Sequence, residues 1–181
     1  KEMNENSKTT TAVLKDMKKR SKKIVMLTAY DHPMAKILDD SGIDIVLLGD
    51  SMGNVVLGHE NTLSVTMDEM ISHAKAVNRA VKKAMFVVDM PFMSYQTGVK
   101  DALLNAARFV KEAGAQGVKI EGDKYLGAIQ AIVDAGIPVM GHIGFTPQLL
   151  HEIGGYKIAG KDKAAAAKIL AQAKKLEKAG V

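Results

Sequence analysis

Charged and polar side chains stand at the ends of four successive apolar segments of this sequence. Asp50 follows the first segment, Asp89 ends the second, Glu121 ends the third and His142 ends the fourth. Lys119 precedes Glu121 by two residues, so both side chains share one face if the segment is a strand. Three carboxylates that meet beside one lysine would suit a hard cation, and oxygen ligands favour Mg²⁺ over zinc.

Each of these residues also has an ordinary structural explanation. An aspartate at a strand end, such as Asp50 or Asp89, often only caps the loop or helix that follows. Lys119 and Glu121 could form a simple internal ion pair, and a lone His142 is more often a hydrogen-bonded residue than a ligand. Their joint occurrence favours a site, because charges on buried strands are costly unless they are paired or bind an ion.

The elements that position these side chains alternate along the chain. Short apolar runs predict strands at 24–28, 44–48, 85–89, 117–121 and 138–142. Apolar residues at helical spacing predict helices at 33–41, 66–83, 99–113, 124–135 and 163–179. Asp31 is expected to cap the first helix, and Thr66 with Glu69 has the spacing of a capping box. Strands that are apolar on both faces and alternate with helices indicate a parallel sheet covered by helices.

Two architectures fit this alternation, an open doubly wound sheet and a (β/α)8 barrel. Glycine follows four of the helices, at positions 42, 114, 136 and 180. A predicted strand closely follows the first three glycines, so a sixth strand is expected to begin near Val181. We therefore interpret the chain as a (β/α)8 TIM barrel truncated after the fifth βα unit, since a complete barrel needs about 250 residues.

The charge of the chain is concentrated near its start. Residues 1–23 contain eight basic and three acidic side chains, which is the entire net charge of +5 of the 181-residue chain. We interpret this segment as a basic, solvated leader helix or arm, and residues 24–181 as the first five βα units of a single barrel domain. The balanced remainder, with four Tyr, four Phe and no Trp, argues against nucleic-acid binding.

Several kinds of chemistry are excluded by what the sequence lacks. Without cysteine there are no disulfides, thiolate zinc sites or cysteine nucleophiles, and a cytoplasmic location is expected. No apolar run approaches the roughly 20 residues that span a bilayer, so no membrane association is expected. The glycine-rich motifs of nucleotide-binding folds, the G-x-S-x-G elbow and the H-E-x-x-H motif are also missing.

Several short motifs occur in order between Thr9 and Val181. They are TAYD at 28–31, LGDSMG at 48–53, GH at 58–59, TL at 62–63, VT at 65–66, DMPFM at 89–93, VKIEG at 118–122, GHIG at 141–144, TPQ at 146–148 and GGYK at 154–157. Their order and spacing resemble the ketopantoate hydroxymethyltransferase family over almost the whole chain.

This resemblance implies a (β/α)8 barrel enzyme of pantothenate biosynthesis. Such an enzyme transfers a hydroxymethyl group from 5,10-methylenetetrahydrofolate to α-ketoisovalerate (3-methyl-2-oxobutanoate), and gives ketopantoate by way of a Mg²⁺-stabilised enolate. By the matching motifs, Asp50 and Asp89 would ligate Mg²⁺. Glu121 would complete the metal environment, directly or through water.

The same motifs imply the substrate contacts. Ser51 and Lys119 would hold the α-keto acid beside Asp50 and Asp89, and His142 would be a supporting polar group near the substrate. The general base that removes the C3 proton is expected to be a glutamate on a sixth strand, beyond the end of this sequence. This chain alone is therefore expected to be inactive or nearly so.

Two other functions fit the same residues. One is another Mg²⁺-dependent α-keto-acid enzyme, of the phosphoenolpyruvate mutase and isocitrate lyase type, which substrate choice would distinguish. The other is an inactive fragment that keeps only the metal site, in which case the reading frame would stop at Val181. The resemblance also implies small-molecule substrates and self-association into a homo-oligomer, a decamer in the family.

Overall fold

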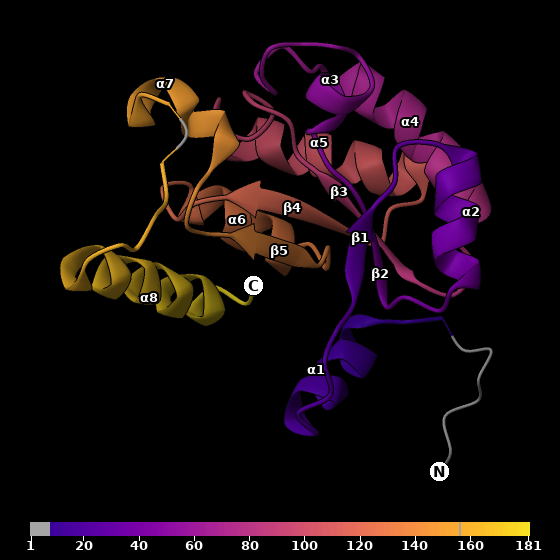
Figure 1. Cartoon of the computed structure of the whole chain (residues 1–181), viewed down its shortest axis with the longest axis horizontal. Coiled ribbons are helices and arrows are strands. Elements are labelled where there is room, and N and C mark those ends of the chain that lie inside the picture. The colour runs from indigo at the N-terminus through magenta and orange to yellow at the C-terminus, as the bar shows by residue number, and fades with distance from the viewer. Residues whose placement is uncertain (1–7, 156) are drawn as a thin grey trace.

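The computed structural model describes residues 8–155 and 157–181, and its centre is a five-stranded parallel sheet. Each strand pairs with its neighbour in the chain, in the order β1-β2-β3-β4-β5 (Figure 1). The strands are β1 (Met26–Thr28), β2 (Ile45–Leu48), β3 (Met85–Asp89), β4 (Gly117–Glu121) and β5 (Val139–His142). The predicted α/β class with a parallel sheet is confirmed. β3 and β4 have the predicted bounds, and the other strands begin one or two residues later than predicted.

Helices lie between successive strands, as the alternation predicts, and further helices precede β1 and follow β5. They are α1 (Thr11–Lys19), α2 (His32–Asp40), α3 (Met52–Val55), α4 (Met67–Ala80), α5 (Val99–Ala113), α6 (Leu126–Asp134), the 3-10 helix η1 (Pro147–Leu149), α7 (Leu150–Ile153) and α8 (Lys163–Lys178). The sequence does not predict α3, η1 or α7, because helices of three or four residues are too short to show a helical period.

Local signals fix where the longer helices begin and end. The Asp31 carboxylate accepts the backbone N–H of Met34 at 2.8 Å, and Thr66 and Glu69 form the predicted capping box at the start of α4. The four glycines after the helices all have positive φ, a conformation that costs glycine little, at 77°, 69°, 84° and 88° for Gly42, Gly114, Gly136 and Gly180.

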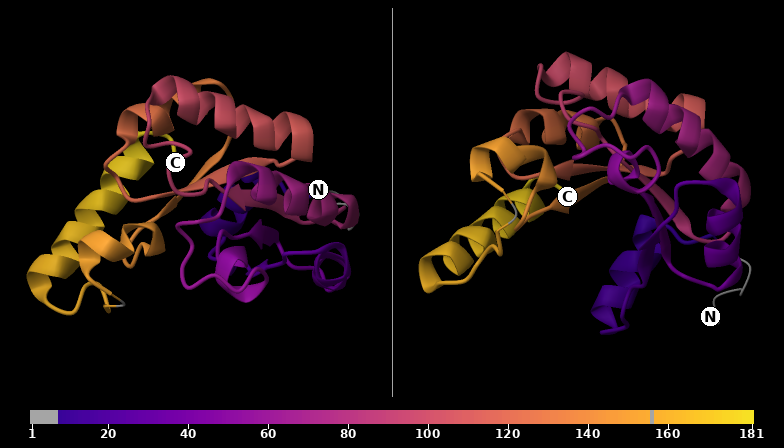
Figure 2. Two further views of the ribbon diagram at one scale, coloured as in Figure 1. Left: turned by 90° about the horizontal axis from the view of Figure 1, so that it is seen from above. Right: turned by 45° about the horizontal axis from the view of Figure 1, so that its top comes forward.

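The main core lies between the sheet and the helices α2, α4, α5 and α6, which cover one of its faces (Figure 2). Alternate strand residues point into this core: Val46, Leu48, Phe86, Val88, Val118, Ile120 and Val139. The intervening residues Ile45, Leu47, Met85 and Val87 form a smaller cluster on the opposite, inner face. Lys119 and Glu121 therefore belong to the inner face, as the alternation along β4 predicts.

The predicted leader is not free in solvent where the structure describes it. Residues 1–7 lie outside the described residues, and α1 begins after the cap residue Thr10. Met17 of α1 is buried, and Leu14 packs against the inner-face cluster of the sheet. Most residues of α1 are exposed, and the apolar stripe of this amphipathic helix covers an apolar surface.

β1 differs from the prediction of strands that are buried on both faces. Met26 and Leu27 are 41% and 49% exposed. β1 is an edge strand that pairs only with β2 in the part of the chain that the structure describes. Burial of a strand depends on its neighbours in space, so an apolar sequence alone does not ensure it.

A buried carboxylate anchors α2 to the segment that enters β3. Asp39 is in the last turn of α2, and its two carboxylate oxygens accept the backbone N–H groups of Lys82, Lys83 and Ala84 at 2.8 to 3.2 Å. These N–H groups precede β3 and have no strand partner of their own there. Asp39 therefore fixes the start of β3 and, with it, the strand that carries Asp89.

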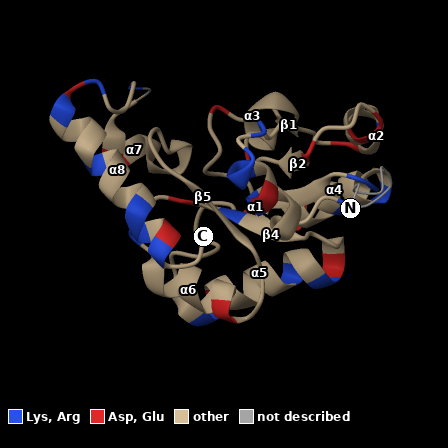
Figure 3. Cartoon of the chain, turned by 90° about the horizontal axis from the view of Figure 1, so that it is seen from below, with Lys and Arg blue, Asp and Glu red and all other residues tan. Residues whose placement is uncertain are grey.

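Many of the charged residues lie on the helices (Figure 3). Arg108 of α5, for example, pairs with Asp68 at the start of α4 and with Glu112, both at 2.8 Å. Such exposed pairs contribute little to stability. In the part of the chain that the structure describes, no helix is long and apolar enough to cross a membrane.

Candidate active site at the carboxyl edge of the sheet

The carboxyl edge of the sheet carries all the residues that the sequence predicts for the site. Asp89, Glu121 and His142 are the last residues of β3, β4 and β5, and Asp50 follows β2 by two residues. In the register, Asp89 lies beside Lys119 and Glu121 lies beside His142. Because neighbouring residues in parallel strands point to the same face, these side chains gather on the inner face.

Asp89 links the first half of the site. One of its carboxylate oxygens, Oδ2, accepts the backbone N–H of Asp50 at 3.1 Å. The other, Oδ1, accepts from the Nζ of Lys119 at 2.5 Å, and both side chains are largely buried. The ion pair and the backbone contact hold the ends of β2, β3 and β4 in one arrangement.

Glu121 links the second half. Its Oε1 lies 3.1 Å from the Nδ1 of His142, and its Oε2 accepts the backbone N–H of Gln148 at 3.0 Å. One ordinary explanation of these residues was an ion pair between Lys119 and Glu121. The structure does not show that pair. Lys119 pairs with Asp89 instead, because Lys119 and Glu121 are successive inner-face residues of one strand and diverge toward different neighbours.

Ser51 joins the site from the other side. Its hydroxyl lies 2.9 Å from that of Tyr30, the residue that follows β1 and Ala29. Gly49 provides the space, since a Cβ at that position would lie 2.6 Å from the Ser51 Oγ and 3.4 Å from Asp89 Oδ2. The Gly-Asp-Ser sequence after β2 thus brings a hydroxyl and a carboxylate to the same edge.

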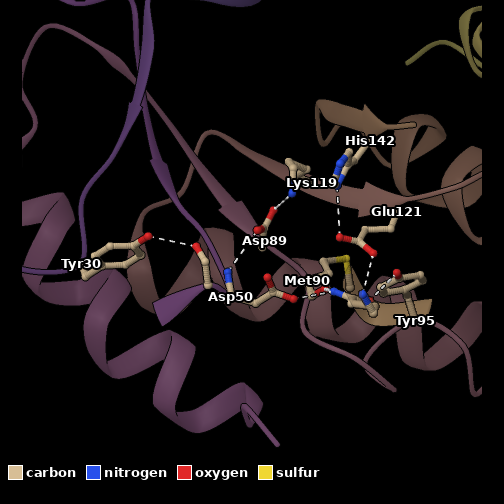
Figure 4. A network of polar contacts seen from close by, with 10 residues as sticks. Tyr30, Asp50, Asp89, Met90, Tyr95, Lys119, Glu121 and His142 are labelled. Atoms are coloured by element: carbon tan, nitrogen blue, oxygen red, sulfur yellow. Dashed lines mark hydrogen bonds and ion pairs between the residues drawn. The ribbon is translucent and has the colours of Figure 1, made fainter. Parts of the chain in front are cut away.

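Gln148 in η1 is a site residue that the sequence analysis missed. Its side chain is buried, and its Nε2 donates to Asp50 Oδ2 at 2.8 Å and to the carbonyl oxygen of Met90 at 2.9 Å. Its Oε1 accepts the Tyr95 hydroxyl at 2.6 Å. Figure 4 shows the resulting network of contacts, which extends from Tyr30 at one end to Tyr95 at the other. The only sequence signal was its place in the TPQ motif, which assigned it no role.

The electrostatics of the site are set by burial. Asp50 is 4% exposed, and burial, followed by the negative charge of Asp89, raises its pKa from 3.8 to about 7. Burial also raises the pKa of the Tyr95 phenol above its usual range, so this hydroxyl keeps its proton and acts as a donor. A carboxylate that is so costly to ionise is one that a nearby cation would stabilise strongly.

The three carboxylates do not form a ready-made ligand cluster. Within residues 8–155 and 157–181, no group of three His, Cys, Asp or Glu side chains is placed to hold a metal ion. Asp89 and Glu121 direct both of their carboxylate oxygens to hydrogen-bond partners. In the described part of the chain, the carboxylate of Asp50 accepts a side-chain hydrogen bond through one oxygen, Oδ2.

The comparison with known families decides the identity of the chain. A model of ketopantoate hydroxymethyltransferase matches residues 8–181. The chain belongs to the ketopantoate hydroxymethyltransferase family. The resemblance that the sequence motifs indicate is therefore confirmed.

Curated relatives within this family carry the name 3-methyl-2-oxobutanoate hydroxymethyltransferase. The protein from Syntrophomonas wolfei subsp. wolfei is 55% identical over 176 residues, which cover 97% of this chain and 64% of the relative. The protein from Acetivibrio thermocellus is 54% identical over 177 residues, which cover 97% of this chain and 62% of the relative. The chain thus spans less than two thirds of the length of these relatives.

Solved structures with a similar fold have different sequences. A phosphonopyruvate hydrolase in complex with oxalate and Mg²⁺ matches with a TM-score of 0.68 at 13% identity, over 99% of this chain and 61% of that one. A 2,3-dimethylmalate lyase of the PEP mutase/isocitrate lyase superfamily matches with a TM-score of 0.67 at 17% identity, over 94% and 59%. These matches show that this chain shares the parallel α/β fold of those structures.

Proposed function

We propose that the protein transfers a hydroxymethyl group from 5,10-methylenetetrahydrofolate to α-ketoisovalerate, giving ketopantoate, and that this chain supplies the metal and keto-acid site. One observation carries the proposal. In a member of the ketopantoate hydroxymethyltransferase family, three buried carboxylates and one ammonium meet at the carboxyl edge of a parallel sheet. That edge is where parallel α/β enzymes bind their substrates.

The residues present fit a divalent cation. Asp50, Asp89 and Glu121 are buried, and Lys119 is the ammonium group that pairs with one of them. The site therefore carries an excess of negative charge in a poorly hydrated place, which favours a hard cation with oxygen ligands. Asp50 and Asp89 would hold Mg²⁺, and Glu121 would complete the metal environment, directly or through water. Bound Mg²⁺ would act as a Lewis acid toward the keto acid.

The other side chains have roles that follow from their charge and position. The Lys119 ammonium would attract the substrate carboxylate and hold it beside Asp89. The Ser51 hydroxyl, positioned by Tyr30, would donate to a substrate oxygen. His142, held by Glu121, would add a polar contact at the same edge. A general base outside this chain would remove the C3 proton of the substrate. The chain alone would therefore bind substrate without turning it over.

The proposal extends to the protein as a whole. The sheet would be five strands of a (β/α)8 barrel, which is supported by strictly sequential parallel strands with α2, α4, α5 and α6 on one face. Residues 24–181 would be part of that barrel domain, and residues 1–23 would be an arm in front of it. Self-association and a cytoplasmic location are part of the same proposal. Nucleic acid and membranes have no role in it.

Proton NMR of α-ketoisovalerate in D₂O tests the site in this chain directly. We expect Mg²⁺-dependent line broadening of the methyl signals, and little exchange of the C3 proton. Asp50→Ala and Lys119→Ala should each abolish the broadening. Lys124→Ala is the matched control, because Lys124 pairs with Glu152 on the surface beyond β4. Pyruvate and oxaloacetate, tested in parallel, should broaden less than α-ketoisovalerate.

Three outcomes would contradict the proposal. Line broadening without Mg²⁺ would show that the keto acid binds without a metal ion, which contradicts the metal site. Stronger binding of pyruvate or oxaloacetate would favour a different α-keto-acid enzyme. Rapid loss of the C3 proton signal in this chain, sensitive to Asp50→Ala, would mean that the base lies within residues 1–181.

A further inference from the structure

Gln148 makes more contacts with the site than any other uncharged residue described there. It lies in η1, after β5, yet its side-chain amide reaches the end of β2 at Asp50 and the end of β3 at Met90. Its backbone N–H reaches the end of β4 at Glu121. Gln148 therefore connects two of the three carboxylates: it contacts Asp50 through its side chain and Glu121 through its backbone N–H.

The orientation of this amide is fixed by its partners. Tyr95 donates its hydroxyl to Oε1 at 2.6 Å, which identifies that atom as the acceptor end. The Nε2 end then has two hydrogens to donate, and its two acceptors are Asp50 Oδ2 and the Met90 carbonyl oxygen. The opposite orientation would point a carbonyl oxygen at a carboxylate and a carbonyl, and would leave the tyrosine without an acceptor.

This fixed amide determines how Asp50 presents its carboxylate. A single donor on Oδ2 limits rotation of the carboxylate group and directs the Oδ1 atom away from Gln148. The backbone contact holds Glu121 in the same way from the opposite side. Hydrogen bonds from Gln148 thus hold both carboxylates in one orientation.

We propose that Gln148 is a positioning residue of the metal site: its amide orients Asp50, its backbone N–H orients Glu121, and Tyr95 sets the direction of the amide. This inference rests on the proposed function, because it needs a cation to bind at these carboxylates. It makes η1 part of the site, although no residue of η1 is proposed to touch the metal.

Direct metal binding tests this role. Mn²⁺ serves as the probe because carboxylate and water ligands suit it as they suit Mg²⁺, and free Mn²⁺ can be measured by electron paramagnetic resonance. Gln148→Met keeps the length of the side chain and removes the donor. We expect its dissociation constant for Mn²⁺ to rise roughly 10- to 100-fold, the usual effect of losing a partner that orients a metal ligand. Tyr95→Phe should raise it by less, because Met90 still holds Nε2.

Ser94→Ala is the matched control. Ser94 precedes Tyr95, its hydroxyl is buried, and it has no hydrogen-bond partner in the described part of the chain. Its removal should leave the dissociation constant unchanged. Urea denaturation without metal distinguishes a positioning role of Gln148 from a purely structural one. If the role is purely structural, Gln148→Met lowers the stability of the protein and leaves the Mn²⁺ affinity of the folded fraction unchanged.

The outcomes distinguish this inference from the proposed function. If the unmodified chain binds no Mn²⁺, the metal site itself is wrong. If the unmodified chain binds Mn²⁺ and Gln148→Met binds it equally well, only the positioning role is wrong. If Gln148→Met fails to fold, Tyr95→Phe decides, and an unchanged affinity in that variant overturns the inference.

Discussion

Asp50→Asn should stabilise the metal-free protein at high pH. The folded chain holds Asp50 with a pKa of about 7, against 3.8 for an ordinary aspartate. Between these values the unfolded chain loses the proton and the folded chain keeps it. Stability therefore falls as the pH rises from about 4 to about 7, and the loss is complete above pH 7. The two pKa values differ by about three, which corresponds to roughly 4 kcal/mol in the free energy of unfolding.

The asparagine variant separates charge from shape. Its amide oxygen can still accept the Nε2–H of Gln148, but it carries no charge at any pH. We expect the variant to match the unmodified chain near pH 4 and to be more stable by up to about 4 kcal/mol near pH 8. Urea denaturation of both proteins at several pH values, without metal, measures this difference.

Addition of Mg²⁺ to the same denaturation assay tests whether Asp50 is a metal ligand. A ligand at 100 times its dissociation constant stabilises the folded state by about 2.7 kcal/mol. Mg²⁺ should therefore raise the stability of the unmodified chain at pH 8 and have little effect on Asp50→Asn. Equal stability of the two proteins at pH 8 without metal would refute the burial argument. An equal response to Mg²⁺ would refute the assignment of Asp50 as a ligand.

Other substitutions test the supports of the site. Asp39→Asn should lower the free energy of unfolding by about 2 kcal/mol in urea denaturation, because one amide oxygen cannot accept the three N–H groups of 82–84. A change below about 0.5 kcal/mol would contradict this. Thr66→Ala should cost about 1 kcal/mol in the same assay through loss of the capping box. Gly49→Ala should fold but push the Ser51 hydroxyl from its tyrosine partner. NMR titration should then show keto-acid binding weakened about fivefold, the loss of one hydrogen bond of about 1 kcal/mol.

The parts of the fold that the sequence predicts well are those with local causes. The capping box at Thr66 and the glycines after the helices act within four or five residues, and both are found where predicted. β3 and β4 have the predicted bounds because a polar residue marks the end of each. The exposure of β1 and the burial of Met17 in α1 depend on distant surfaces, and no local pattern reveals them.

The site divides in the same way. Strand periodicity places Lys119 and Glu121 on one face, the strand ends place Asp89 at the same edge, and the structure puts them there. Their pairing is not local: Lys119 contacts Asp89, on the neighbouring strand, in place of Glu121. The role of Gln148 could not be predicted at all, since it depends on the path of the chain after β5 back toward β2. The metal and substrate roles of these residues remain predictions.

The sequential order of the strands has a consequence for the newly made chain. Every strand pairs with the one synthesised just before it, so the sheet can grow by one βα unit at a time as the ribosome delivers the chain. The bond between Asp50 and Gln148, in contrast, joins residues 98 positions apart. At about 5 to 20 residues per second, roughly 5 to 20 seconds separate their synthesis. During that interval the Asp50 carboxylate of the nascent sheet lacks its amide partner.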